Sequence, residues 1–69
     1  MTVDEYKAKI KENAIENYEE WTNIDALFNH VSDEVLAEML EKGIKVRDAT
    51  FYCLLSSVLK VKVTKEMLP

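Results

Sequence analysis

Cysteine, histidine, glycine and proline are almost missing from this sequence, and their scarcity excludes several classes of protein. Each of the four occurs once among the 69 residues, the cysteine as Cys53 and the histidine as His30. A single cysteine cannot form an intrachain disulfide, and one cysteine with one histidine cannot supply the three or four soft ligands of a structural zinc site. We therefore expect no metal and no cofactor, and the lone thiol favours a reducing compartment.

Signatures of catalysis are also missing. The sequence contains no glycine-rich phosphate loop, no nucleophile beside a plausible base, and no partner for its single histidine. Glu16, Glu19 and Glu20 flank Tyr18 on what should be a solvated helix face, where a run of charge usually has no catalytic role. A core of short helices also leaves no volume for an active-site pocket. The sequence therefore predicts a protein that is not an enzyme.

The scarcity of turn residues favours helices, because an all-β domain needs many tight reversals. Apolar residues make up 48% of the chain, which is too much for a disordered segment. The first twelve residues alternate in charge, so we expect neither a secretory signal nor a membrane-spanning helix. We predict a cytoplasmic protein without a membrane partner, folded as one all-α domain over residues 1–69, in a compact bundle of three to four helices.

The first predicted helix follows a capping-box pattern, in which Thr2 is followed three residues later by Glu5. One apolar stripe then recurs at steps of three and four residues and is expected to face the core. Ile15 lies off this stripe and is a candidate contact residue. The stripe consists of Val3, Tyr6, Ile10, Ala14, Tyr18 and Trp21.

Two shorter helices are predicted next, one through residues 24–31 and one through residues 33–42. Gly43 should end the second of them, because glycine adopts the left-handed conformation without strain, and Ile44 suits the apolar contact that accompanies such a stop. The candidate N-caps are Thr22 or Asn23 for the first helix and Ser32 or Asp33 for the second.

A fourth helix is predicted to begin at Asp48 as its N-cap and to run to about Lys60. Its large apolar side chains cover an arc of about 160°, which is typical of a central helix with that arc in the core. The arc contains Phe51, Tyr52, Leu54, Leu55, Val58 and Leu59, and the opposite, smaller face contains Ala49, Thr50, Cys53, Ser56, Ser57 and Lys60. Residues 61–64 alternate in polarity, so the tail either forms a short strand or extends the helix.

The order of a helix, a glycine stop, a short turn and a second helix is that of a helix-turn-helix. The residues that carry this pattern are Gly43, Val46, Ala49, Thr50, Val61, Lys62 and Val63. Over residues 33–63 the pattern resembles the DNA-binding domain of arginine-repressor-type regulators, in which a Val-Lys-Val-like strand follows in the same register. The resemblance implies a helix-turn-helix unit, and DNA as the partner under this alternative.

The sequence departs from that family where bases would be read. The family carries a polar Ser-Arg-Asp where this chain has residues 52–54, Tyr-Cys-Leu, and the preceding glutamine of the family is Asp48 here. Base edges are read chiefly by Arg, Lys, Asn and Gln, so direct readout would be poor, and a few phosphate contacts would give weak, salt-dependent binding. The DNA-binding candidates are Lys45, Arg47, Thr50, Ser56, Lys60 and Lys62. Equally, the same helix order can serve only to pack a bundle.

Charge is distributed unevenly along the chain, and this favours a second kind of partner. Residues 1–43 contain four lysines against eleven acidic residues, a net charge of −7, whereas residues 44–69 contain five basic against two acidic residues, a net charge of +3. An acidic surface can occupy the basic groove of a nucleic-acid-binding protein. The candidate contact residues are Glu12, Ile15, Glu16, Glu19, Glu20 and Asp25.

The leading hypothesis is therefore a small protein-binding regulator or inhibitor, of the kind that phages and mobile elements encode. Self-association is a further prediction, because so short a chain gains from burying more apolar area. Cys53, Ser56 and Ser57 are small enough to let two helices approach closely.

Overall fold

The computed structural model describes residues 1–18 and 23–69, and within these residues it is built from helices without strands. The elements in chain order are α1 (Val3–Tyr18), η2 (Ile24–Ala26), α2 (Asp33–Glu41), α3 (Val46–Leu59) and η3 (Lys65–Met67), η2 and η3 being single 3₁₀ turns. The prediction of a compact all-helical chain is confirmed, with three α-helices and a Cα radius of gyration of 10.7 Å.

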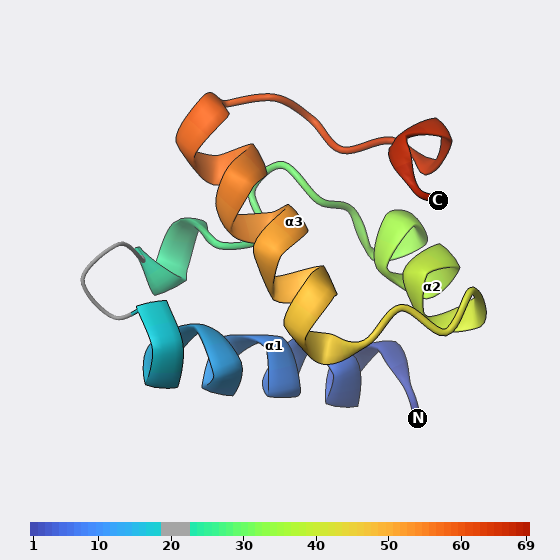
Figure 1. Ribbon diagram of the computed structural model, residues 1–69, viewed down its shortest axis with the longest axis horizontal. Helices are drawn as coiled ribbons and strands as arrows, with labels where there is room; N and C mark the ends of the chain where they lie inside the picture. The colour runs from blue at the N-terminus through green and yellow to red at the C-terminus, as the bar shows by residue number, and fades with distance from the viewer. Residues whose placement is uncertain (19–22) are drawn as a thin grey trace.

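α1 is the element on which the others assemble. It makes the main contacts with α2, α3 and η2, and in Figure 1 α3 crosses the front of the molecule above it, with α2 to one side. The sequence-based prediction of a central fourth helix was therefore wrong, because the central position belongs to the first helix. Among the described helices, none is long and apolar enough to cross a membrane.

The start of α1 has the predicted capping box. The backbone N–H of Glu5 donates to Thr2 Oγ1 at 3.2 Å, and the backbone N–H of Thr2 donates to Glu5 Oε1 at 3.1 Å. The hydrogen bond from the Thr2 backbone lowers the pKa of the Glu5 carboxyl group, because it favours the charged form. Two of the four backbone donors that have no partner within the helix are thus satisfied locally.

The predicted apolar stripe of α1 does face the core. Tyr6, Ile10 and Ala14 are buried, and Val3 is half-buried against them. Trp21, the last residue of the stripe, lies outside the described residues. A buried tyrosine usually needs a hydrogen-bond partner for its hydroxyl group. The Tyr6 hydroxyl donates to the backbone carbonyl of Ile44 at 2.6 Å. This bond joins α1 to the turn between α2 and α3.

α2 begins and ends where the sequence indicates. Ser32 is the N-cap, with its Oγ accepting from the Val35 N–H at 3.3 Å. At the other end Gly43 has a φ of +73°, its N–H bonds to the Leu40 carbonyl at 3.1 Å, and the Ile44 N–H bonds to the Met39 carbonyl at 3.0 Å. These two bonds make a Schellman motif, which fixes the direction in which the chain leaves α2.

The helix predicted over residues 24–31 is shorter than expected. Only Ile24–Ala26 is helical, as a 3₁₀ turn, and residues 27–30 continue as turns. Asn23 caps it, with its Oδ1 accepting from the Asp25 N–H at 3.1 Å; the other candidate cap, Thr22, lies outside the described residues. Leu27 and Val31 are buried, so the segment still contributes to the core.

α3 begins two residues before the predicted cap. Its N-cap is Lys45, which makes no side-chain capping bond, and Asp48 lies in the first turn. A carboxylate there is favourable to the helix dipole, so Asp48 supports the helix start without capping it. The helix stops at Lys60, which adopts a left-handed conformation with a φ of +57°.

The chain after α3 is neither a strand nor an extension of the helix, so both alternatives for the tail were wrong. It crosses the molecule as an irregular segment that ends in η3 (Figure 1). The Val63 N–H donates to the His30 carbonyl at 2.9 Å, and the side chains of Val63 and Leu68 are buried. The Lys42 ammonium group also donates to the Pro69 carbonyl at 3.1 Å, so the segment is held by apolar anchors and by hydrogen bonds to its backbone.

The contribution of the Tyr6–Ile44 hydrogen bond to stability can be tested by removing the tyrosine hydroxyl oxygen. We expect Tyr6→Phe to lower the free energy of unfolding by about 1–2 kcal/mol, because the carbonyl of Ile44 loses its donor in a partly buried site. Urea denaturation followed by circular dichroism measures the change, with Tyr52→Phe on half-buried Tyr52 as the control. Equal effects of the two substitutions would show that the bond has no special role.

Candidate protein-binding surface

The side of α3 that faces the core is made of small residues. Ala49, Thr50 and Cys53 have no exposed surface, and Ser56 is 4% exposed. Small side chains let two helices approach closely, and α3 packs against α1, whose bulky Tyr6 fills the same buried cluster. The large residues on α1 and the small residues on α3 therefore complement one another.

The two hydroxyl groups on this side are satisfied within α3 itself. Thr50 Oγ1 donates to the Val46 carbonyl at 2.7 Å, and Ser56 Oγ donates to the Cys53 carbonyl at 2.8 Å. Hydroxyl groups bonded back to their own helix can be buried at little cost. This is why a face that contains a threonine and a serine can serve as a core face.

Burial also makes the single thiol unreactive. Cys53 is fully buried, and removal from water raises its pKa to about 12. The thiolate is the nucleophilic form of cysteine, so a buried thiol with a raised pKa reacts more slowly than an exposed one.

The large apolar side chains of α3 point to solvent, which reverses the predicted orientation of this helix. Phe51 is 55% exposed, Leu55 43%, Val58 65% and Leu59 60%, while Tyr52 and Leu54 are half-buried. The prediction placed the largest apolar arc in the core, and it was wrong because α1 already supplies the bulk there. Two further residues of the C-terminal segment, Val61 and Met67, are 47% and 51% exposed.

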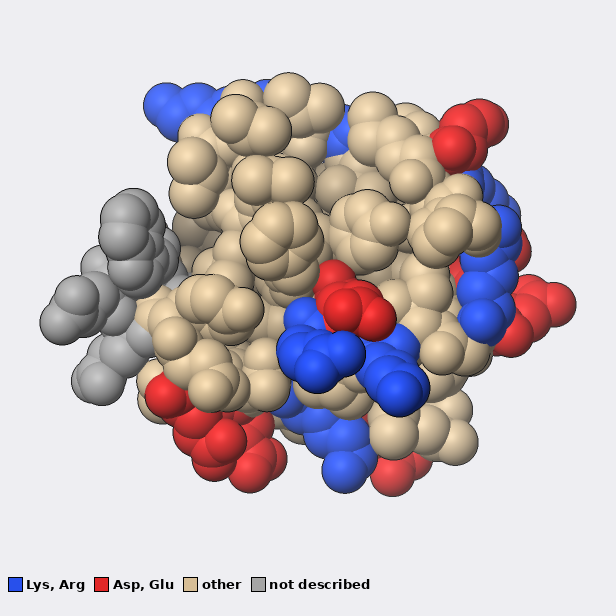
Figure 2. Space-filling view, in the orientation of Figure 1, with Lys and Arg blue, Asp and Glu red and all other residues tan. Residues whose placement is uncertain are grey.

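These residues form one continuous surface. We call it the apolar α3 surface, defined as Phe51, Leu55, Val58, Leu59, Val61 and Met67. Leu55 lines three shallow grooves, one toward Tyr18 at the end of α1, one toward Ile44 and Pro69, and one toward η3. Figure 2 shows uncharged side chains over α3 and the C-terminal segment, with charged side chains gathered near one end of α3 and around the edge.

The two ends of this surface differ in charge. Asp48 is exposed at the N-terminal end of α3, where its Oδ1 lies 3.8 Å from Nε of the exposed Arg47. At the other end Lys60 and Lys62 are exposed. The surface thus has an apolar centre, an acid–base pair at one end and two lysines at the other.

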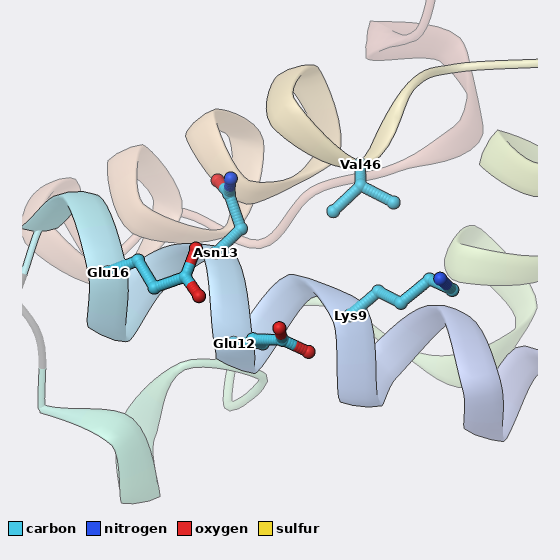
Figure 3. Close-up of a pocket in the computed structure, with 5 residues that line it drawn as sticks. All are labelled: Lys9, Glu12, Asn13, Glu16 and Val46. Atoms are coloured by element: carbon cyan, nitrogen blue, oxygen red, sulfur yellow. The ribbon is translucent and has the colours of Figure 1, made fainter.

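The described members of the acidic set predicted from the sequence do not surround this surface. Glu12 and Glu16 are exposed on α1, where they line a shallow groove of about 230 Å³ together with Lys9, Asn13 and Val46. In Figure 3 the two carboxylates lie along α1, Asn13 points toward α3 and Val46 projects from the start of α3. The ammonium group of Lys9 in the same groove partly offsets the negative charge.

The other members of that acidic set are scattered or undescribed. Ile15 is 49% exposed on α1, and Asp25 is exposed on η2. Glu19 and Glu20 lie outside the described residues. Among the described acidic residues of the set, the structure brings together Glu12 and Glu16.

The DNA-binding candidates are divided by the structure. Thr50 and Ser56 are buried, so they must be removed from that set: their hydroxyl groups bond to their own helix and cannot reach a duplex. The basic candidates Lys45, Arg47, Lys60 and Lys62 are exposed. The first two lie before or at the start of α3 and the last two beyond its end, which for a helix of this length is a separation of roughly 20 Å.

The described residues include no group of three or more His, Cys, Asp or Glu side chains that could hold a metal ion. Comparison with protein-family models, with curated proteins and with solved structures found no match to this chain. Function is therefore argued from the geometry of the apolar α3 surface.

The sequence did contain a signal for the true orientation of α3. Ala49, Cys53 and Ser56 recur at steps of four and three, so they form a stripe of small residues on one side of a helix. Such a stripe indicates close helix packing as readily as an apolar arc indicates burial. The choice between the two sides depends on what α1 presents, and that contact is not local in sequence.

The high pKa of Cys53 predicts how stability depends on pH. The folded thiol keeps its proton until about pH 12, whereas the unfolded thiol loses it near its ordinary pKa of about 8.5, so unfolding becomes more favourable as pH rises between these values. The free energy of unfolding should therefore fall by up to about 1.4 kcal/mol per pH unit in this range, and Cys53→Ala should remove this part of the fall. Urea denaturation of both proteins between about pH 8 and about pH 10.5 measures the difference, and parallel curves would contradict a buried thiol.

Proposed function

We propose that this chain is a protein-binding domain without catalytic activity and that it binds through the apolar α3 surface. The observation that carries the proposal is the exposure of six large apolar side chains, between 43% and 65%, on one helix and the segment that follows it. Monomeric proteins seldom expose a contiguous apolar patch of this kind unless it meets another molecule. Shallow grooves with an apolar lining suit side chains of a protein partner.

The charge of the chain supports a regulatory contact without supplying the main binding energy. Exposed carboxylates such as Glu12, Glu16 and Asp25 give the first half of the chain a negative field, which steers basic partners toward it. Charges at the rim of an interface change the rate of association more than the affinity. In this proposal the acidic residues guide a partner, and the apolar α3 surface holds it.

The alternative is a helix-turn-helix DNA-binding regulator. The order of α2, the connection over residues 42–45 and α3 is compatible with such a unit. Against it, the exposed side of α3 would present Phe51, Leu55 and Val58 to a groove, and these side chains have no hydrogen-bond donors for base edges. The geometry therefore favours protein over DNA as the partner.

A capture experiment separates the two candidate surfaces. The chain is immobilised and exposed to a lysate that also contains the same chain with a second tag. We expect the double variant Leu55→Glu, Val58→Glu to capture much less protein than wild type, because two carboxylates would have to be buried in the contact. Quantitative mass spectrometry measures the retained proteins, and circular dichroism confirms the fold of each variant.

Two controls make this result specific. Ile15→Glu changes an equally exposed apolar residue that lines none of the three grooves, and it should retain the captured proteins. Glu12→Lys with Glu16→Lys and Asp25→Lys tests the acidic surface and should affect capture much less than the α3 variant. Loss of capture in this triple variant alone would reject the apolar α3 surface.

Binding of random duplex at about 50 mM salt that is lost at about 200 mM would favour the DNA alternative.

A further inference from the structure

We propose that the apolar α3 surface is occupied by a second copy of this chain, with the two α3 helices packed antiparallel about a twofold axis near Leu55. The inference rests on the proposed function and names the partner for the same surface. Three observations carry it: the size of the exposed apolar area, the symmetry of its side chains about Leu55, and the unequal charges at its two ends.

The exposed area is of the size that a small dimer needs. Six side chains that are each about half exposed amount to on the order of 600 Å² of apolar surface, if a large residue offers roughly 200 Å² in the extended chain. A single patch on a monomer seldom exceeds roughly 600 Å², and each partner of a standard interface buries about 800 Å². The apolar α3 surface therefore offers about three quarters of the area of one side of a standard interface.

The arrangement of the side chains is self-complementary. In a twofold interface contacts occur in reciprocal pairs: if residue i contacts residue j of the partner, residue j contacts residue i of the partner. In an antiparallel helix pair centred on Leu55, Phe51 lies four residues before the centre and Leu59 four residues after it. Tyr52 and Val58 are related in the same way at three residues. All of these positions share one side of a helix, so each aromatic residue meets an aliphatic residue of the partner.

The charges at the ends favour the antiparallel over the parallel arrangement, because residues 45–48 sum to +1 and Lys60 with Lys62 to +2, so pairing unlike ends brings less like charge together. Asp48 is exposed at the N-terminal end of α3, and Lys60 and Lys62 are exposed beyond its C-terminal end. Antiparallel packing places each Asp48 near the lysines of the other copy, whereas parallel packing places Lys60 and Lys62 of the two copies against each other. Arg47 is 77% exposed beside Asp48, about 100° away around the helix, and it lies at the rim where water screens it. Antiparallel helix dipoles also attract one another.

This contact differs from the self-association predicted from the sequence. That prediction relied on close approach through Cys53, Ser56 and Ser57, but Cys53 and Ser56 are already buried against the rest of the chain. The small residues are used inside each copy, and the large residues remain for the contact between copies.

Sedimentation velocity of the purified full chain, from about 1 µM to about 500 µM, tests the inference. We expect a reversible shift from monomer to dimer mass over this range. Leu55→Glu should weaken dimerisation at least about tenfold, because it places two carboxylates at the axis. Val58→Lys is a second variant in case the first folds poorly, and Ile15→Glu is the matched control that should dimerise like wild type.

Cross-linking tests the geometry separately. In a Cys53→Ala background, Leu55→Cys puts two thiols at the axis, where mild oxidation should give a covalent dimer in high yield. Ile15→Cys in the same background should give little. Asp48→Lys should weaken dimerisation, and adding Lys60→Asp and Lys62→Asp should restore part of it.

The possible results distinguish the failure of the inference from the failure of the proposed function. If the chain is a monomer at every concentration, a second copy does not occupy the surface and the inference is overturned. If the variant Leu55→Glu with Val58→Glu nevertheless loses the proteins captured from the lysate, a different protein occupies the surface and the proposed function stands. Dimers that Leu55→Glu and Val58→Lys leave unchanged overturn the inference, because the contact then lies elsewhere. Monomers that bind anionic lipid vesicles through the same residues overturn both proposals.

Discussion

The close contact between α3 and α1 determines which side chains of this protein meet solvent. α1 brings the bulk to the centre, with Tyr6 and Ile10 almost fully buried, and α3 meets it with Ala49 and Cys53. Once the small side of a helix is turned inward, the large apolar side has to be turned outward, because the two lie on opposite sides of the same cylinder. The exposure of Phe51 and Val58 is thus a consequence of how the core is filled.

Features that depend on a few neighbouring residues could be predicted from the sequence. The capping box at Thr2, the N-cap at Ser32 and the glycine stop at Gly43 all depend on hydrogen bonds within six residues, and all have the expected form. The apolar stripe of α1 could also be predicted, because its opposite side is strongly charged and leaves one choice of orientation. In these places the local physics has a single outcome.

Features that depend on distant contacts could not be predicted. Both sides of α3 avoid charge over most of their length, so periodicity alone cannot say which one is buried, and the larger side was chosen wrongly. The tail after Lys60 alternates like a strand, but the Val63 N–H bonds to the carbonyl of His30, which lies in a turn and not in a neighbouring strand. The prediction of DNA-binding residues failed for the same reason. Lys45 and Lys62 are exposed as expected, whereas Thr50 and Ser56 are in the core.

The orientation of α3 also links the fold to the function that we propose. A chain of 69 residues has a small core, and leaving large apolar side chains in water forgoes part of the stabilisation that they could provide. Contact with another protein recovers that stabilisation, so binding and stability are coupled through the same residues. In the dimer that we propose, the charges at the ends of the surface favour the antiparallel arrangement.

The most direct test of this account is the rate at which Cys53 of the native protein reacts with an aromatic disulfide reagent at low protein concentration. Because Cys53 is fully buried on the core side of α3, the account predicts a rate at least about a hundredfold below that of an exposed thiol, limited by opening of the fold. The reference is Ile15→Cys in a Cys53→Ala background. Equal rates for the two thiols would mean that α3 presents its small side to solvent, which would contradict both the fold described and the surface built on it.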